Sequence, residues 1–427
     1  MKILIRNGRI IDPQHYIDEK LDILIHGNRI EKIDKHIRPK GNDIQVIDAS
    51  HHIIAPGLID IHAHLREPGF EYKETIKTGT MAAVKGGYTS IVCMANTDPV
   101  NDNKSITEHI IKQAKAEGLC RVFPCGAISK GLKGEELAEI GEMFSAGIIA
   151  ISDDGKSVKN ADLLKKALEY ALLFNIPLIS HCEDENLAQG YVHEGHASLF
   201  SGLDTIPSIA EEVVVKRDIT IAQYVGAPIH LTHISTAGSV EAIAMAKKKY
   251  KKITCDTCPH YFTLTDEATL TFDTNTKVNP PLRSKHDLES IKEGLKNNTI
   301  DIIATDHAPH DLTSKDVEFN LASWGISGIE TAFSLSLRLV HEGVLTLNEL
   351  LKKFTVNPAK LLKLPYGHLA PEGIADLIVF NPDIEWVVNK DAFLSKGKNT
   401  PFHGWKLKGK NLLTIVNGRI VYRDPAI

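Results

Sequence analysis

Polar side chains recur at every second position of one apolar segment, GLIDIHAH, which spans residues 57–64. Asp60, His62 and His64 would share one face of a β-strand, because successive side chains of a strand point to opposite faces. Two imidazoles two residues apart, on the same face of a strand, can bind a single divalent metal ion. A lone His-x-His pattern often arises by chance, so this segment needs support from elsewhere in the chain.

Four further segments place His or Asp where a strand-like run ends. They are ISDDG (151–155), ISHC (179–182), THIS (232–235) and TDHAPH (305–310). Solvated rim residues or hydrogen-bonded core histidines would be the ordinary explanation for any one of them. Imidazoles and carboxylates at the ends of five strands together favour one shared metal centre.

The elements that would carry these residues alternate between two patterns. Short β-branched runs are typical of strands buried in a parallel sheet, and they span 53–65, 88–96, 120–129, 148–154, 176–183, 227–235, 253–263 and 299–307. Amphipathic helical patterns lie at 104–117, 135–146, 160–174, 209–225, 239–249, 285–297 and 328–342. Eight strands that alternate with helices predict an α/β fold of the (β/α)₈ TIM-like barrel type, with its active site at the carboxyl ends of the strands. A doubly wound sheet is the alternative, but no GxGxxG motif follows the first strand.

The two ends of the chain have a different pattern. Short strand-like pieces fill residues 2–53 and 374–423, with turn signals at Asn7-Gly8, Gly27-Asn28 and Asn417-Gly418. Neither end alone could bury a full core, so we predict that they pair into one small β-sandwich domain. The predicted division assigns residues 1–53 and 371–427 to this composite domain and residues 54–370 to the barrel.

Composition limits the other classes of protein. Of 427 residues, 43% are hydrophobic and 24% are charged, as in a folded globular chain. A net charge of −5 gives no electrostatic basis for binding nucleic acid, and no apolar run approaches the ~18 residues of a membrane span. The N-terminus has no signal-peptide core, and the six cysteines fit reduced thiols, so we expect a cytoplasmic protein. We expect a small-molecule substrate and neither a nucleic-acid nor a membrane partner, and we leave a homodimer open.

The motifs resemble those of the amidohydrolase superfamily along essentially the whole chain. Within it they are similar to the dihydroorotase family of the long bacterial type, through GLIDIHAHLREPG, CMANTDP, ISDDG, ISHCED, HISTAGS, CDTCPHYFTLT, KVNPPLR and ATDHAPH. The resemblance implies a metal-dependent hydrolase on a (β/α)₈ barrel with a small β domain from both chain ends. It also implies reversible conversion between L-dihydroorotate and N-carbamoyl-L-aspartate in de novo pyrimidine (UMP) biosynthesis.

The resemblance also implies two Zn²⁺ ions per subunit. One ion would be bound by His62, His64 and Asp306, the other by His181 and His233, and both by Asp154. Hydantoinases and allantoinases usually bridge their ions with a carboxylated lysine on strand four, where this chain has Asp153-Asp154, with Lys156 beyond. We take Asp154 as the bridge, and the unknown register of the strand leaves Asp153 open. Imidazole and carboxylate ligands suit Zn²⁺, and Mn²⁺ or Co²⁺ would also fit.

The implied reaction is attack of a metal-bridged hydroxide on the ring amide carbonyl. Asp306 would accept the hydroxide proton as general base and deliver it to the departing ring nitrogen as general acid. Arg66, two residues after His64, offers a bidentate partner for the substrate carboxylate. By resemblance, the substrate-binding set is His64, Arg66, Asn96, Asn279, His310, Trp324 and Gly325. The segment 311–327, which contains Trp324-Gly325, would lie over the mouth of the barrel.

Two alternatives are open at this point. Another cyclic amidase, of hydantoinase or allantoinase type, would share the fold, but Arg66 and the aspartate on strand four argue against it. A non-catalytic structural relative would tend to lose metal ligands, whereas all six positions here carry competent residues. Cys255 and Cys258 have the spacing of a redox or zinc pair, but no second CxxC accompanies them, so we expect a structural role.

Overall fold

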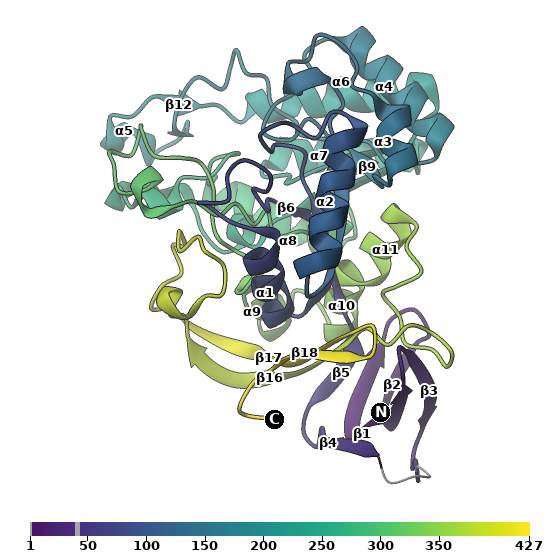
Figure 1. Cartoon of the computed structure of the whole chain (residues 1–427). Helices are drawn as coiled ribbons and strands as arrows, with labels where there is room; N and C mark the ends of the chain where they lie inside the picture. The colour runs from purple at the N-terminus through teal and green to yellow at the C-terminus, as the bar shows by residue number, and fades with distance from the viewer. Residues whose placement is uncertain (1, 39–42) are drawn as a thin grey trace.

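The computed structural model describes residues 2–38 and 43–427. Residues 1 and 39–42, which fall within the predicted terminal β domain, lie outside the described residues. The chain builds a barrel of strands and helices and, beneath it, a mixed sheet that contains both chain ends (Figure 1).

Eight short parallel strands form the barrel. One four-stranded sheet contains β6 (Leu58–Ala63), β7 (Tyr88–Cys93), β8 (Arg121–Gly126) and β9 (Ala150–Ile151), and a second contains β10 (Ile179–Ser180), β13 (Ile229–Leu231), β14 (Ile253–Thr257) and β15 (Ile302–Ile303). Parallel bridges join Ile151 to Leu178 and Ala63 to His307, which links the two sheets at both edges. The predicted (β/α)₈ barrel is therefore confirmed.

Helices cover the outside of this barrel (Figure 1). They are α1 (Ile76–Gly86), α2 (Lys104–Glu117), α3 (Ile140–Ala146), α4 (Ala161–Phe174), α6 (Ile209–Val225), α7 (Ala237–Lys249), α8 (Lys285–Lys296), α9 (Ala332–His341), α10 (Leu347–Phe354) and α11 (Val356–Leu362). A long excursion after β10 holds β11 (Val192–His193), α5 (Ser198–Ser201) and β12 (Thr205–Ile206). Of the described residues, no helix is long and apolar enough to cross a membrane.

Several predicted boundaries were wrong, each for a local reason. The run 53–65 divides at Gly57, and its first part, β5 (Ile53–Pro56), joins the terminal sheet. The run 253–263 ends at Thr257, because Pro259 begins the 3₁₀ helix η2 (Pro259–Phe262) and proline cannot donate to a strand ladder. The helix α1 had no predicted range, although Thr75 begins it with a capping box.

The terminal sheet draws strands from both chain ends. Its order is β18-β17-β16-β5-β1-β2-β3, with β4 beside β1. These strands are β1 (Lys2–Asp12), β2 (Ile17–His26), β3 (Arg29–Asp34), β4 (Ile44–Asp48), β16 (Leu377–Val387), β17 (Lys406–Val416) and β18 (Arg419–Arg423). The pairing of the two ends agrees with the prediction, and the exact division at residues 53/54 and 370/371 stays a prediction.

Two of the three turn signals in the chain ends mark hairpins. Gly27-Asn28 joins β2 to β3 and Asn417-Gly418 joins β17 to β18, as predicted. The prediction for Asn7-Gly8 was wrong, because both residues lie inside β1 at a shift in its register with β2. The Asn7 N–H donates to Asp22 Oδ1 there, so the Asn-Gly pair serves a bulge instead of a turn.

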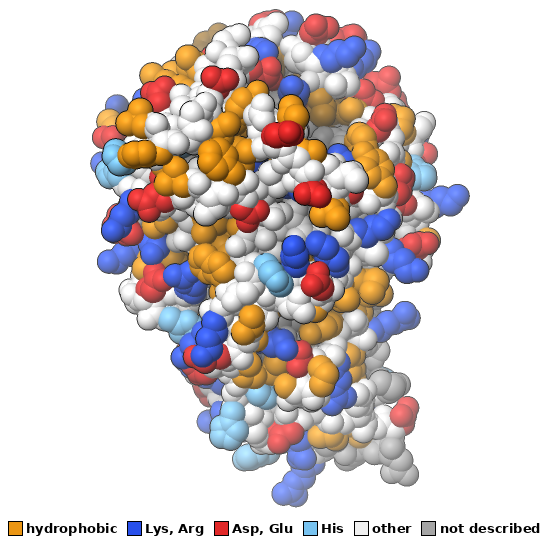
Figure 2. Space-filling view, turned by 90° about the vertical axis from the view of Figure 1, so that its left-hand side faces the viewer, with side chains coloured by type: hydrophobic (Ala, Val, Ile, Leu, Met, Phe, Trp, Pro, Cys, Tyr) orange, Lys and Arg blue, Asp and Glu red, His pale blue; other side chains and the backbone are white. Residues whose placement is uncertain are grey.

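Charge is interspersed over the surface. On the face drawn in Figure 2, basic and acidic side chains alternate among apolar ones over the broad barrel and the narrower terminal part. This agrees with the near balance of 49 basic and 54 acidic residues.

Candidate active site

The six predicted metal-binding side chains meet inside the mouth of the barrel. All are buried, and all come from β6 or from the carboxyl ends of β6, β9, β10, β13 and β15; they are His62, His64, Asp154, His181, His233 and Asp306. The parallel strands bring residues more than two hundred positions apart in the sequence to one point.

Asp154 lies at the centre of the four histidines. Its Oδ2 is 3.1 Å from His62 Nε2 and 3.5 Å from His64 Nε2. Its Oδ1 is 3.4 Å from both His181 Nδ1 and His233 Nε2. One carboxylate therefore contacts all four imidazoles, as a ligand that bridges two ions would.

Asp153 is turned away from this cluster. Its Oδ1 accepts hydrogen bonds from the backbone N–H groups of Ile128 (2.7 Å) and Ser129 (2.9 Å). Lys156, the nearest lysine in the sequence, is exposed. Of the alternatives left open by the sequence, the structure places only Asp154 among the histidines.

Asp306 lies against the two histidines of β6. Its Oδ1 is 3.2 Å from His64 Nε2 and 3.6 Å from His62 Nε2. Burial opposes ionisation of this carboxyl, but the hydrogen bond from His64 and the neighbouring imidazoles outweigh it and lower the pKa of Asp306 to about 2. The group is therefore held as a carboxylate.

Three of the predicted site residues have a strained backbone. Arg66, His233 and Asp306 have φ values of 62°, 40° and 44°, in the left-handed region that non-glycine residues rarely adopt. Such strain persists only where the surrounding structure fixes it, and it concentrates at functional sites. All three residues line one cavity at the barrel mouth.

Further buried polar groups form hydrogen bonds with residues of the cluster or with their neighbours. His62 Nδ1 is 2.8 Å from Thr232 Oγ1, and the backbone N–H of His233 donates to Asp256 Oδ1 at 2.8 Å. Asp60 is one of these groups: it accepts the Thr305 N–H at 3.0 Å, beside Asp306. Partners of this kind orient metal-binding side chains.

The cluster fits divalent cations. Among the described residues, the buried Nε2 atom of His181 has no hydrogen-bond partner, and that of His62 lies 3.1 Å from Asp154 Oδ2 without the geometry of a hydrogen bond. Burial disfavours a charge on His62, yet Asp154 and Asp306 raise its pKa to about 10, so the surroundings favour positive charge at this point. Four imidazoles and two carboxylates are also a typical donor set for zinc and related ions.

A cavity of about 320 Å³ opens onto the cluster. Its lining includes every residue expected to contact substrate: His64, Arg66, Asn96, Asn279, His310, Trp324 and Gly325. His64 Nδ1 is 2.9 Å from Asn96 Oδ1, and Arg66 Nη2 is 3.3 Å from His310 Nε2. Burial and the nearby Arg66 charge lower the pKa of His310 to about 2, so this imidazole is neutral.

Other polar residues at the site were not predicted from the sequence. His260 is buried beside Asp306 and forms with Cys258 a group of possible metal ligands around that carboxylate. Asn399 reaches the loop after β15 from the far end of the chain. The motif CPHY after β14 could have pointed to His260, whereas no local signal marks Asn399.

The sequence is similar to that of known proteins. A family model described as dihydro-orotase-like matches residues 51–239. The chain is 52% identical to the dihydroorotase of Syntrophus aciditrophicus over 425 residues (99% of this chain, 100% of that protein), and 52% identical to that of Acetivibrio thermocellus over 427 residues (100% of both).

Solved structures show the same fold at lower identity. The dihydropyrimidinase of Brevibacillus agri has a TM-score of 0.87 at 24% identity, covering 99% of this chain and 95% of that one. The L-hydantoinase of Arthrobacter aurescens has a TM-score of 0.89 at 23% identity, covering 99% and 96%. The fold is thus shared with several cyclic amidases, and the full-length identity of about one half to curated dihydroorotases shows that the chain belongs to the dihydroorotase family.

Proposed function

We propose that this protein is a dihydroorotase that interconverts L-dihydroorotate and N-carbamoyl-L-aspartate in pyrimidine biosynthesis. The observation that carries the proposal is the buried cluster of four imidazoles and two carboxylates, at the barrel mouth of a chain from the dihydroorotase family. Hydrolysis breaks the bond between the ring carbonyl carbon and the ring nitrogen and adds water across it.

Two zinc ions are the proposed cofactors. His62, His64 and Asp306 would hold one ion, His181 and His233 the other, and Asp154 both. When bound, the ions would lower the pKa of a water molecule and polarise the ring carbonyl. Of the possible metal-ligand groups in the structure, His62/His64/Asp306 matches the first ion, and His62/Asp154/His233 joins ligands proposed for both ions around the bridging Asp154.

Asp306 is the proposed proton carrier. Its low pKa keeps it ionised, so it is ready to accept the proton of the attacking water. It would return the same proton to the ring nitrogen as the carbon–nitrogen bond breaks, and no proton is gained or lost by the protein. The roles reverse in the direction of ring closure.

Arg66 is the proposed partner of the substrate carboxylate. It is half-buried and lines the cavity, where Nε donates to Pro309 O at 3.2 Å and Nη2 lies 3.3 Å from His310 Nε2. The neutral His310 and the side chains of Asn96 and Asn279 would complete the contacts. The cytoplasmic location and the assembly state stay predictions.

The competing proposal is a hydantoinase-like or allantoinase-like amidase, because a dihydropyrimidinase and an L-hydantoinase share this fold. Steady-state rates with dihydroorotate, hydantoin and allantoin on one preparation distinguish the two. We expect dihydroorotate to be the fastest of the three by a wide margin. If dihydroorotate is the slowest, the proposed function is wrong.

A further inference from the structure

The connection between β16 and β17, residues 388–405, leaves the terminal sheet and returns to the mouth of the barrel. It is the yellow loop that rises beside the barrel in Figure 1. Two carboxylates of the barrel hold its base: Glu330 Oε1 accepts the N–H of Ser395 at 3.1 Å, and Glu74 Oε2 accepts that of Lys396 at 3.2 Å. The connection is therefore fixed to the barrel before it reaches the site.

Asn399, near the end of this connection, uses its whole amide on the 311–327 loop and its flanks. Oδ1 accepts the His310 N–H at 2.8 Å and the Ser327 hydroxyl at 2.9 Å. Nδ2 donates to Ala308 O and Gly325 O, both at 3.0 Å. The Asn399 backbone carbonyl accepts the Ser327 N–H at 2.7 Å.

These bonds join the two ends of the loop across the chain. Ala308 and His310 precede the loop, and Gly325 and Ser327 close it. Since His310 and Gly325 line the cavity, one buried amide, 4% exposed, fixes both positions relative to each other.

The backbone of the connection also packs tightly here. A Cβ atom at Gly397 would lie 2.5 Å from Pro309 Cβ and 2.8 Å from the His310 nitrogen. Only a residue without a side chain allows this approach. The contact is therefore built from the connection as a whole, and not from a single side chain that happens to reach the loop.

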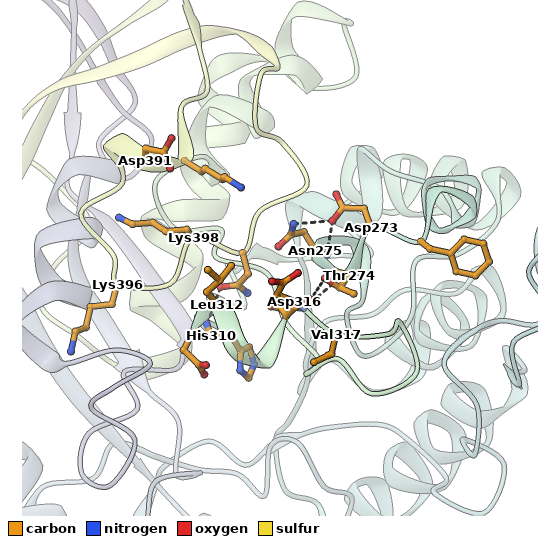
Figure 3. A pocket seen from close by; sticks show the side chains of 15 residues that line it. Asp273, Thr274, Asn275, His310, Leu312, Asp316, Val317, Asp391, Lys396 and Lys398 are labelled. Atoms are coloured by element: carbon orange, nitrogen blue, oxygen red, sulfur yellow. Dashed lines mark hydrogen bonds between the residues drawn. The ribbon is translucent and has the colours of Figure 1, made fainter.

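Space exists on the outer side of the loop. A cavity of about 600 Å³ lies there, lined by Lys396 and Lys398 of the connection on one side and by Asp273 and Asn275 on the other, with Asp316 of the loop between them (Figure 3). A loop released from Asn399 would have room to move outward on this side, and its other ties are bonds to residues 274–277, such as Lys315 Nζ to Thr274 O and the Gly325 N–H to Lys277 O, both at 2.9 Å.

We propose that Asn399 is a positioning residue for the reaction: it holds His310 and Gly325 in place and so keeps the substrate cavity preformed. The inference deepens the proposed function and rests on it. Substrate contacts, and not the metal ligands, depend on the loop, so loss of the amide should act on substrate binding more than on turnover of bound substrate.

The test compares Asn399→Leu with Asn411→Leu. Asn411, 5% exposed, likewise donates a buried amide to backbone carbonyls, of Val84 and Lys85, but it ties β17 to α1 and does not line the cavity. We expect Asn399→Leu to raise KM for dihydroorotate at least tenfold and to change kcat less than threefold, with bound zinc unchanged. Asn411→Leu should lower the melting temperature and leave KM near the wild-type value.

Hydrogen exchange gives a readout independent of activity. Peptides covering residues 308–327 should lose protection in Asn399→Leu and keep it in Asn411→Leu. Ser327→Ala, which removes one of the bonds to Asn399, should show the same changes to a smaller degree, and it serves if Asn399→Leu does not fold. Wild-type KM with unaltered protection of 308–327 in these variants would overturn the inference. A wild-type protein inactive on dihydroorotate would overturn the proposed function instead. The hydrogen-exchange comparison would then still test whether Asn399 fixes the loop.

Discussion

Asp22 in the terminal sheet and Asp306 at the barrel mouth are both buried carboxylates, 3% and 5% exposed. Asp22 accepts the backbone N–H groups of Asn7 and Ile37, each at 3.0 Å, and lies 3.9 Å from Arg6. Asp306 instead faces imidazoles and an open cavity. Burial of a charge therefore has a different meaning in the two regions: in the sheet the protein's own N–H groups satisfy the charge, and at the mouth it lies open to the cation and substrate that we propose.

The largest expected effect separates these two carboxylates. Asp306→Asn should lower kcat for dihydroorotate by at least about 10³-fold, because it removes the proton carrier and a metal ligand. Asp22→Asn should keep kcat and cost about 1–3 kcal/mol of unfolding free energy, because buried N–H groups lose a charged acceptor. Kinetics and urea unfolding of both variants check the prediction. A large loss of kcat in Asp22→Asn would contradict the distinction between a structural carboxylate in the sheet and a catalytic one at the barrel mouth.

Metal removal should also act on one region only. Prolonged dialysis against a chelator should abolish turnover, and zinc should restore it, with about two ions per chain at full activity. The terminal sheet holds none of the six proposed ligands, so far-ultraviolet circular dichroism should change little. Full activity after complete removal of metal, verified by elemental analysis, would contradict the assignment.

Two arginines extend the comparison to cations. Arg66→Met should raise KM for dihydroorotate about 30-fold, which corresponds to roughly 2 kcal/mol for a lost charge-assisted hydrogen bond. Arg121 pairs with the buried Asp376 and stacks 4.3 Å from the Tyr366 ring centroid, where β8 meets the terminal sheet. Arg121→Met should therefore cost about 3 kcal/mol of stability and leave KM unchanged. An unaltered KM in Arg66→Met would remove the carboxylate assignment.

The sequence predicted best what repeats locally or follows from parallel strands. The alternation of His62 and His64 is a property of one strand, and a parallel barrel necessarily brings its carboxyl ends together, which explains why Asp154, His181, His233 and Asp306 converge. The choice between Asp153 and Asp154 needed the actual register, since one step turns a side chain to the opposite face.

What the sequence could not predict depends on contacts between distant segments. Asn399 lies 89 positions from His310, and its role depends on how one loop folds back over another. Asn7-Gly8 has the composition of a hairpin turn, but pairing of β1 with β2 on both sides of it keeps the strand continuous. Tertiary context decided both cases against local preference.

The smallest predicted effect concerns Lys277, whose ammonium group lies near the site and loses hydration on burial. Lys277 Nζ lies 4.5 Å from the Trp324 ring centroid and 4.9 Å from that of Tyr191, and it donates to Asn320 O at 2.9 Å. Burial lowers its pKa from 10.5 to about 8. Below pH 8 the folded protein must hold the buried charge, and between pH 8 and 10.5 the unfolded chain binds more protons than the folded one.

The unfolding free energy of the wild type should therefore rise relative to that of Lys277→Met as the pH increases from about 7.5 to 10. Urea unfolding of both proteins across this range measures the difference. A constant difference would mean that the aromatic rings and the Asn320 carbonyl offset the cost of burying the ammonium group. In that case Lys277 would belong with Asp22, as a charge that the fold satisfies, and the contrast between the two regions would apply only to the groups that face the substrate cavity.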